Sequence, residues 1–449
     1  MTQLVVLGAG GDLTSRYLIP ALGELDAAGA LPDGLTIVGV DRQPWGDNEF
    51  RRHLASRLDR HHASLLSALR YQPGDVTDAR ALREAFEPAG SPAVAYLALP
   101  PHVVPGAVRA LGALQLPTGS RIVAEKPFGD DADSAHELNT LLQGVVAEEH
   151  VFRVDHFLGK QTVQNVLGLR FANRVFEAVW NAQHVEAVDI IWDETLALEG
   201  RAGYYDAAGA LRDMVQNHLL QLLCLLAMEP PVALDERSLR DRKIDVLRAV
   251  RRPTLDDVRC HTTRARYRAG VVAGVAVPAY IDEPGVDPER RTETFAAVTL
   301  FVDNWRWAGV PFTLRSGKAL GADRHEVRVR FRPVPHLAFD QDHDPDPNVL
   351  RLDVDPDRVT LEVNLNGAGD PFHLERASLA VDLAPQELSA YARLLLDIFA
   401  GDPVLSIRAD EAEEAWRIIE PILHGWRTDV SPLLDYPAGS AGPDEARDR

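Results

Sequence analysis

The feature that most constrains this chain is the repeated order of elements over its first 150 residues. A short apolar run, Leu4–Leu7, is followed by a glycine-rich turn and by a helical stretch that reaches about Ala28. Further apolar runs, with helical stretches between them, follow at residues 35–40, 93–99 and 121–124. Alternation of strand and helix predicts a parallel sheet covered by helices on both faces. Such a sheet binds its ligand at the carboxyl ends of its strands.

After about residue 155 the pattern changes. Helical stretches come first, at residues 162–171 and 210–228. Alternating strands follow, at residues 292–302, 326–331 and 358–364. This order predicts a second α+β domain with a large, mainly antiparallel sheet. We therefore expect a Rossmann-like, doubly wound dinucleotide-binding domain over residues 1–154, an α+β domain over residues 155–440 and a disordered tail over residues 441–449.

Charge and composition exclude several classes of protein. The net charge of −20 argues against nucleic acid or an anionic membrane as a partner. Two cysteines, Cys224 and Cys260, are too few for a disulfide framework and fit a reducing cytosol, so we expect a cytoplasmic protein. The first residues contain no basic leader. The sequence contains no spacing typical of a metal site, and we expect no metal.

Lysine is rare in this chain. Four of the 47 basic residues are lysines: Lys126, Lys160, Lys243 and Lys318. A lysine retained among so many arginines indicates a need for a small, mobile ammonium group. Three of the four stand beside glycine or proline, whereas Lys243 lies in a charged run and is expected on the solvated surface. The alternative is a codon bias that leaves a few lysines at random.

The turn after the first apolar run has the composition of a phosphate-binding loop. Its residues are Gly8, Ala9, Gly10, Gly11, Asp12 and Leu13. Glycines there let backbone N–H groups approach a pyrophosphate at the positive end of a helix. Leu13 stands where a full dinucleotide fingerprint has its third glycine, so an ordinary tight turn remains the alternative.

The end of the second apolar run leaves the coenzyme open. A carboxylate such as Asp41 at this position favours the ribose hydroxyls of NAD and repels a 2′-phosphate. An arginine such as Arg42 binds the 2′-phosphate of NADP. Both are present here, and a plain surface turn is the third possibility.

Two polar runs carry the remaining candidates. Asp155, His156 and Lys160 place a carboxylate, an imidazole and an ammonium group at the proposed domain junction. A carboxylate can orient a catalytic histidine, or His156 and Lys160 can bind an anion, or the group can be a structural ion pair. The helical stretch 210–228 opens with polar residues that include Asp213 and His218, which indicates a pocket or a structural histidine.

Taken together, these motifs resemble the glucose-6-phosphate dehydrogenase family, and the resemblance covers nearly the whole chain. The matching segments are Gly8–Leu13, Glu125–Gly129, Arg153–Gln161, Val163–Asn165, Leu169–Asn173, Glu199–Asp206, Arg212–Gln221, Ala227–Glu229, Asp303–Lys318 and Tyr436–Ser440. The resemblance implies oxidation of glucose 6-phosphate at C1 to the lactone, with hydride transfer to NAD or NADP. It also implies a homodimer or homotetramer that assembles through the second domain, which binds the sugar phosphate.

The resemblance also assigns roles to single residues. His218 would be the general base, Asp155 would hold its imidazole, and Lys126, before a cis proline, would lie between sugar and nicotinamide. His156 and Lys160 would contact the substrate phosphate. The positions expected to bind sugar hydroxyls are Glu194, Asp213 and Lys318. The coenzyme would be held by the turn Gly8–Leu13, by Arg42 with Asp41 beside it, and by Lys126.

Four positions depart from the family pattern. Phe157 replaces a tyrosine, Asp323 stands where a basic residue is usual with Arg324 next to it, Asp41 replaces a small residue, and Ser15 replaces a basic one. Two alternatives therefore stay open. One is the same chemistry on another 6-substituted or unphosphorylated hexose, and the other is a non-catalytic binding or assembly subunit on this fold.

Overall fold

The computed structural model describes residues 3–55, 63–86, 91–198, 200, 202–339, 345–354, 356–369 and 372–444. The chain divides into two compact units. The first comprises residues 1–160, 231–241 and 386–413, and the second comprises residues 161–230, 242–385 and 414–449. The domain boundary that the sequence places at residue 155 stays a prediction. No helix in the described ranges is long and apolar enough to cross a bilayer.

The first unit is built on a parallel sheet. Within the described residues it has six strands in the order β3-β2-β1-β4-β5-β6. The strands are β1 (Gln3–Leu7), β2 (Thr36–Asp41), β3 (Leu69–Pro73), β4 (Ala93–Leu97), β5 (Arg121–Glu125) and β6 (Val151–Val154). Every pairing is parallel, and the strand order is that of a doubly wound dinucleotide-binding fold, which confirms the prediction for this half.

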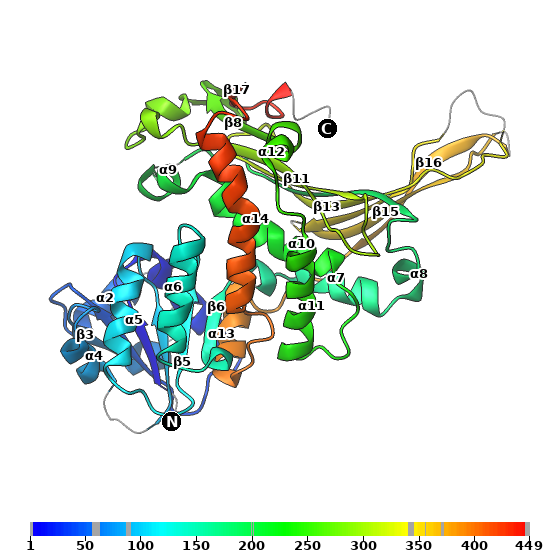
Figure 1. Cartoon of the computed structure of the whole chain (residues 1–449). Helices are drawn as coiled ribbons and strands as arrows, with labels where there is room; N and C mark the ends of the chain where they lie inside the picture. Colours follow the sequence, from blue (N-terminus) through cyan, green and yellow to red (C-terminus); the bar gives the residue numbers. More distant parts are fainter. Residues whose placement is uncertain are drawn as a thin grey trace. The chain divides into compact units, whose positions relative to one another are not determined.

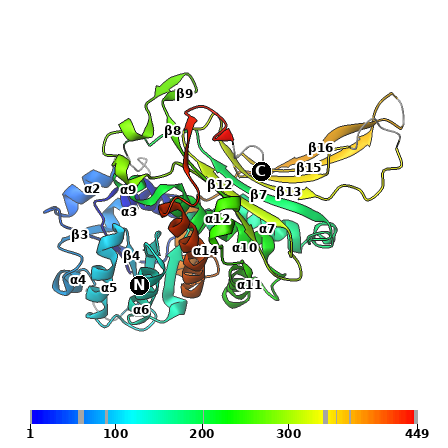
Figure 2. The same ribbon diagram turned by 45° about the horizontal axis from the view of Figure 1, so that its top comes forward.

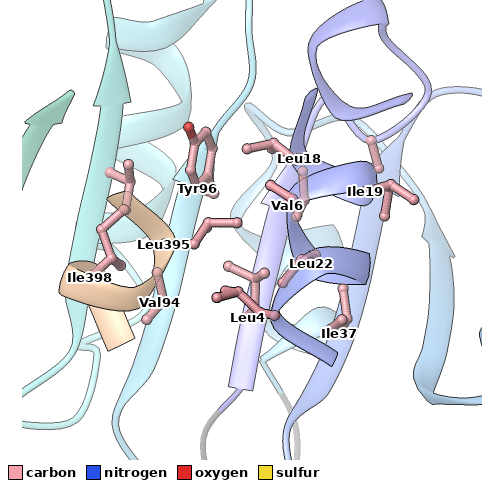
Figure 3. Packing of buried hydrophobic residues seen from close by; sticks show 14 of the residues in the cluster. Leu4, Val6, Leu18, Ile19, Leu22, Ile37, Val94, Tyr96, Leu395 and Ile398 are labelled. Carbon is pink, nitrogen blue, oxygen red and sulfur yellow. The ribbon is translucent and has the colours of Figure 1, made fainter. Parts of the chain in front are cut away.

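Helices cover both faces of this sheet. Successive strand residues point to opposite faces, and in β1 both sets are buried. Leu4 and Val6 join a core with η1 (Thr14–Leu18), α1 (Ile19–Ala27), α2 (Asp47–Ala55), α3 (Ala63–Ala68) and α13 (Ala390–Ala400). Figure 3 shows Leu18 and Leu22 on one side of this core and Leu395 and Ile398 of α13 on the other.

The first unit contains further helices outside this core. They are η2 (Pro101–Val103), η3 (Glu148–His150), η4 (His156–Gly159), α4 (Ala79–Ala85), α5 (Val104–Gly112) and α6 (Ala132–Gln143). Among them η4 packs on α13, α4 packs on α5, and α5 packs on α6. The alternation of strand and helix therefore predicted the layers correctly, whereas α13 comes from the far end of the chain.

The second unit is built on a mainly antiparallel sheet. In the part of the chain that is described, nine strands have the order β16-β15-β14-β13-β7-β12-β11-β8-β17. They are β7 (Val185–Asp193), β8 (Thr262–Arg268), β11 (Phe295–Phe301), β12 (Pro311–Gly317), β13 (Arg324–Phe331), β14 (Val349–Val354), β15 (Asp357–Asn366), β16 (Leu374–Asp382) and β17 (Leu433–Pro437). The pairs β7–β12 and β8–β17 are parallel, and the other pairs are antiparallel.

Helices pack on this sheet and carry the candidate residues. Helix α7 (Gln161–Phe171) contacts β14 and β15, and η5 (Leu211–Leu219) contacts β11 and β12. The other elements are α8 (Arg174–Glu177), α9 (Ala202–Ala210), α10 (Leu220–Ala227), α11 (Glu236–Ala249), α12 (Leu255–His261), α14 (Ala409–Arg427), β9 (Gly270–Val272), β10 (Val275–Val277), η6 (Tyr280–Asp282) and η7 (Pro288–Arg290). In Figures 1 and 2 the β15–β16 hairpin extends beyond the other strands of its sheet.

The expected tail falls partly outside the described residues. Residues 445–449 lie outside the description, and residues 441–444 lie inside it. The Ala441 carbonyl accepts a hydrogen bond from Arg315 Nη2 at 2.7 Å. This contact ties the start of the expected tail to β12.

Candidate active site

The glycine turn is held between the ends of two strands. Gly8 has a φ of +90°, and a Cβ atom there would lie 2.2 Å from the Ala98 carbonyl oxygen, so only glycine fits. The Gly8 and Ala9 N–H groups both donate to the Val40 carbonyl. The turn leads directly into the helical segment η1–α1. This geometry brings the loop backbone to the positive end of a helix, as the sequence predicts and as pyrophosphate binding requires.

The last two residues of this turn have different surroundings. Asp12 is exposed, and its Oδ1 atom lies 3.4 Å from Nε of Arg16, four residues further along the chain. Leu13 is partly buried and packs against the core of the first unit. Leu13 therefore serves packing at the position where a third glycine would have allowed a closer approach of helix and sheet.

Asp41 ends β2 and turns its carboxylate toward the glycine turn. Its Oδ2 accepts the Gly10 N–H at 2.9 Å, and its Oδ1 accepts the Arg42 N–H at 2.7 Å. The Arg42 guanidinium extends into solvent and donates to Asp75 Oδ2 at 2.9 Å. Asp41 thus fixes the glycine turn against the end of β2.

Lys126 follows directly after β5. The Lys126–Pro127 peptide bond is cis, as the resemblance implies. Glu125, the last residue of β5, accepts the Tyr96 hydroxyl hydrogen bond at 2.5 Å. Burial raises the pKa of Glu125 to about 7, against the lowering effects of Tyr96 and Lys126. In the sequence Glu125 stands out only as part of the motif Glu125–Gly129, because its burial depends on residues far along the chain.

Asp155, His156 and Lys160 follow β6. The Asp155 side chain is buried. Its carboxylate caps η4 by accepting the Phe157 N–H at 2.9 Å. The Lys160 ammonium lies 5.2 Å from the centroid of the Phe157 ring, against which His156 packs edge to face. The structure therefore brings these candidates together around Phe157, which occupies the place where the resemblance expects a tyrosine.

The first-unit candidates all occupy the same edge of the parallel sheet. The turn follows β1, Asp41 ends β2, Lys126 follows β5, and Asp155 follows β6. Carboxyl ends of parallel strands meet at one edge, and ligands of open α/β sheets bind there. A dinucleotide therefore fits this unit.

In the second unit, Lys318 and Glu194 form an ion pair. The Lys318 Nζ atom lies 2.6 Å from Glu194 Oε2, and both side chains are largely buried. The same ammonium lies 5.2 Å from the centroid of the Tyr205 ring. Burial raises the pKa of Tyr205 well above its usual value, and Asp213 adds to this. Three residues expected to bind the sugar thus gather around Tyr205.

His218 lies on an unusual helix. The sequence predicts one helical stretch over residues 210–228, and the structure divides it into the π-helix η5 and the α-helix α10. Single-turn π segments occur often at functional sites because their i→i+5 hydrogen bonds reposition side chains. Gln216, Asn217 and His218 are all buried here.

Glu293 holds the start of this π-helix. Its Oε1 atom accepts the Leu211 N–H at 3.0 Å, and its carbonyl accepts the Ala210 N–H. Burial raises the pKa of Glu293, while Leu211 and Arg212 lower it. Gly209 has a φ of +70°, and a Cβ atom there would lie 2.4 Å from Glu293 Oε1. Sequence reasoning missed both residues, because their pairing joins positions more than 80 residues apart.

Arg170 holds the other end of the segment. Its guanidinium is fully buried and donates to the carbonyl oxygens of Leu225 and Met228, both at 2.8 Å. Burial lowers its pKa to about 10, opposed by Glu177. The carbonyl groups at the end of a helix need such partners. His218 therefore lies on a helix that is fixed at both ends by buried charged side chains.

The departures at Asp323 and Arg324 have defined partners. Asp323 accepts the Thr195 N–H at 2.6 Å and its hydroxyl at 3.2 Å. Arg324 donates through Nε and Nη2 to Asp193 Oδ2. Arg324 is thus engaged with Asp193 and does not replace the basic residue that the family pattern has at position 323.

The expectation for Lys243 is wrong. Its side chain is 1% exposed, whereas the charged run predicted a solvated surface. The reason is its position on α11, where Leu239 and Leu247 lie four residues before and after it and are buried on the same face. Lys243 therefore belongs to the structural core.

Comparison with known proteins decides the family. A family model described as "Glucose-6-phosphate dehydrogenase, NAD binding domain" matches residues 5–165, and one described as "Glucose-6-phosphate dehydrogenase, C-terminal domain" matches residues 167–449. The chain belongs to the glucose-6-phosphate dehydrogenase family. The fold class and the resemblance inferred from the sequence are thereby confirmed.

Individual relatives agree with this assignment. The chain is 41% identical over 480 residues to glucose-6-phosphate 1-dehydrogenase of Treponema pallidum (strain Nichols), which covers 99% of this chain and 92% of that protein. It is 40% identical over 476 residues to the enzyme of Zymomonas mobilis, with 99% and 96% covered. A solved glucose-6-phosphate dehydrogenase in complex with its substrate glucose 6-phosphate is 32% identical, with a TM-score of 0.88 and 100% and 96% covered.

A prediction follows for the start of the π-helix. Gly209→Ala should lower the midpoint of thermal unfolding, because its Cβ atom would meet Glu293 and because alanine is strained at positive φ. We expect a loss of more than about 1 kcal/mol. Gly203→Ala is the matched control, because Gly203 also lies in α9 and nothing lies within 4 Å of its Cβ position. Equal losses in both variants would contradict the role given to the Gly209–Glu293 contact.

Proposed function

We propose that this chain oxidises glucose 6-phosphate at C1 to 6-phosphogluconolactone and passes a hydride to a nicotinamide dinucleotide. The observation that carries the proposal is the extent of the likeness. Both family domains match, and a dehydrogenase solved with its substrate glucose 6-phosphate covers the whole chain. Each residue that the resemblance assigns to the reaction is also present.

The fit of the coenzyme rests on the glycine turn. A Cβ atom at Gly8 would lie 2.2 Å from the Ala98 carbonyl oxygen, and one at Gly10 would lie 3.0 Å from Asp41 Oδ2, so side chains are kept out of the turn where a pyrophosphate would approach the start of the helical segment η1–α1. The bound coenzyme supplies the acceptor for the hydride. Lys126 follows β5 at the same sheet edge and would face the nicotinamide.

The chemistry of the chain's own residues is acid–base chemistry. We assign His218 as the general base that takes the proton of the C1 hydroxyl as hydride leaves C1. The resemblance implies that Asp155 stabilises the positive charge that then develops on the His218 imidazole. The residues that hold the sugar hydroxyls are Glu194, Asp213 and Lys318. The Lys318–Glu194 ion pair beside the Tyr205 ring, which Asp213 also influences, supports this role.

The first test is the removal of the general base. His218→Ala should reduce kcat about 10²–10⁴-fold in an assay of NADH or NADPH formation with glucose 6-phosphate, and circular dichroism should show an intact fold. His184→Ala, at an exposed loop histidine, is the matched control and should keep normal turnover. A near-normal kcat for His218→Ala would end the catalytic assignment.

The choice of coenzyme is the finer part of the proposal. We propose that NAD is used at least as well as NADP, because the Asp41 carboxylate would repel a 2′-phosphate. The Asp41 contact with Gly10 also means that removing this side chain would loosen the turn. Asn retains one oxygen that can accept the Gly10 N–H and loses only the acceptor for the Arg42 N–H, so Asp41→Asn removes the charge while keeping the contact that fixes the turn.

Asp41→Asn should therefore shift the ratio of kcat/KM values toward NADP by about 1–2 kcal/mol, which is roughly 5- to 30-fold. Arg42→Ala is the complementary variant and should weaken NADP more than NAD. Steady-state kinetics with both coenzymes measure the two effects. A wild-type enzyme with an overwhelming preference for NADP would show that Asp41 does not meet the ribose.

A second candidate substrate class has specific support. Phe157 lacks a hydroxyl group, and Arg324 is engaged with Asp193, so we expect the contact with the substrate phosphate to rest on His156 and Lys160. We expect glucose 6-phosphate to react with a raised KM. Phe157→Tyr should lower that KM roughly tenfold or more, because a hydrogen bond to a charged group is restored.

A panel of hexoses decides between the two classes. Glucose 6-phosphate, free glucose and other 6-substituted hexoses are compared by kcat/KM in the wild-type enzyme. If free glucose reacts as well as the phosphate ester, the phosphate roles of His156 and Lys160 fail. The homodimer or homotetramer that the resemblance implies stays a prediction.

A further inference from the structure

Tyr391 joins several candidate residues of the first unit. It is the second residue of α13, a helix that reaches this unit from the far end of the chain. Its ring stacks with that of Tyr17 at a centroid distance of 5.3 Å and with that of His156 at 5.6 Å, where the planes differ by 12°. Tyr17 belongs to η1, which begins just after the glycine turn. The Tyr391 ring therefore contacts both a residue just after the glycine turn and a residue expected to bind the substrate phosphate.

The hydroxyl of Tyr391 makes a further contact. It lies near the buried carboxyl of Glu125 and lowers the pKa of that group, which accepts the Tyr96 hydroxyl at 2.5 Å. Tyr96 lies on β4 at the edge of the core beside α13, as Figure 3 shows. Glu125 is joined through the backbone to Lys126. The same side chain thus stacks on His156 with its ring and places its hydroxyl near the residue before Lys126.

The packing around Tyr391 leaves it little freedom. A Cβ atom at Gly159 would lie 2.7 Å from the Ala390 carbonyl oxygen, so the start of α13 lies directly against the end of η4. Gln386 Nε2 donates to the Gly159 carbonyl at 2.9 Å. These contacts hold the helix start against the segment that carries His156.

We propose that Tyr391 is a positioning residue, whose ring orients the His156 imidazole toward the substrate phosphate and whose hydroxyl fixes Glu125 behind Lys126. The inference rests on the proposed function and adds a residue to it. A core residue of α13 such as Leu395 would contribute to stability through packing alone. Tyr391 would in addition set the protonation of Glu125, because its hydroxyl stabilises the charged form of that carboxyl.

The groups that face Glu125 come from several elements. Tyr96 lies on β4, Lys126 follows β5, Asp155 follows β6, and Tyr391 lies on α13. Burial raises the Glu125 pKa to about 7, and Asp155 raises it too, whereas both tyrosine hydroxyls and Lys126 lower it. Loss of the Tyr391 hydroxyl must therefore raise this pKa further.

The experiment separates ring from hydroxyl. Tyr391→Phe keeps the ring and should move the acid limb of the pH profile of kcat to higher pH, with the KM for glucose 6-phosphate little changed. Tyr391→Leu removes the stack as well and should raise that KM roughly 2- to 12-fold. Tyr71→Phe is the matched control, because it also loses one tyrosine hydroxyl, which donates to the Gln43 carbonyl.

A second readout does not depend on turnover. The Glu125 pKa is raised above its ordinary value of 4.5, so the stability linked to its protonated form is present at low pH and is lost as pH rises toward 7. The thermal midpoint of the wild-type protein should therefore fall, relative to that of Glu125→Gln, as the pH rises from the ordinary value of 4.5 to about 7. In Tyr391→Phe the fall should begin at the same pH, continue to higher pH and be larger in total.

The outcomes distinguish a failure of the Tyr391 inference from a failure of the proposed function. An unchanged acid limb and an unchanged thermal titration in Tyr391→Phe, with normal wild-type turnover, would overturn the inference and leave the proposed function intact. A wild-type protein that does not oxidise glucose 6-phosphate would overturn the proposed function, and the thermal titration would still test the link between Tyr391 and Glu125.

Discussion

The first unit depends on the burial of both faces of one parallel sheet. Leu4 and Val6 pack on one side of β1, and Val5 and Leu7 are buried on the other. A parallel sheet that is covered on both faces leaves only its edges and strand ends for polar groups. The glycine turn, Asp41, Lys126 and Asp155 each stand at such an end. Apolar burial therefore decides where the chemistry of this half can be placed.

The second unit uses buried charged residues to hold a helix segment. Glu293 accepts an N–H group at the start of η5, and Arg170 donates to carbonyl groups at the end of α10. A buried charge is costly unless it is hydrogen bonded, and removal of one partner leaves the other unsatisfied. Such contacts favour a single arrangement of the segment over alternatives. His218 lies between them on a π-helix, a conformation that propensity alone does not favour.

Residues with local signals were found from the sequence, and residues with distant partners were not. The glycine turn and the cis proline after Lys126 belong to short motifs that the sequence displays directly. Glu293 and Gly209 form a contact across more than 80 residues, and Tyr391 reaches His156 across more than 200. Lys243 was misplaced because a run of charged residues does not reveal which helix face is buried. The pairing of Arg324 with Asp193 appears only when β7 and β13 lie side by side.

The sequence by itself determined the family, the order of strands and helices in the first 150 residues, the mainly antiparallel sheet of the second half and the candidate residues. Local periodicity, turn chemistry and short motifs carry this information because they involve neighbours along the chain. Only the tertiary structure decided which carboxylates are buried, which arginines are engaged and that α13 completes the core of the first unit. The physical reason is that burial and hydrogen bonding depend on residues brought together by packing, and their energies are set by surroundings that no local stretch of sequence contains.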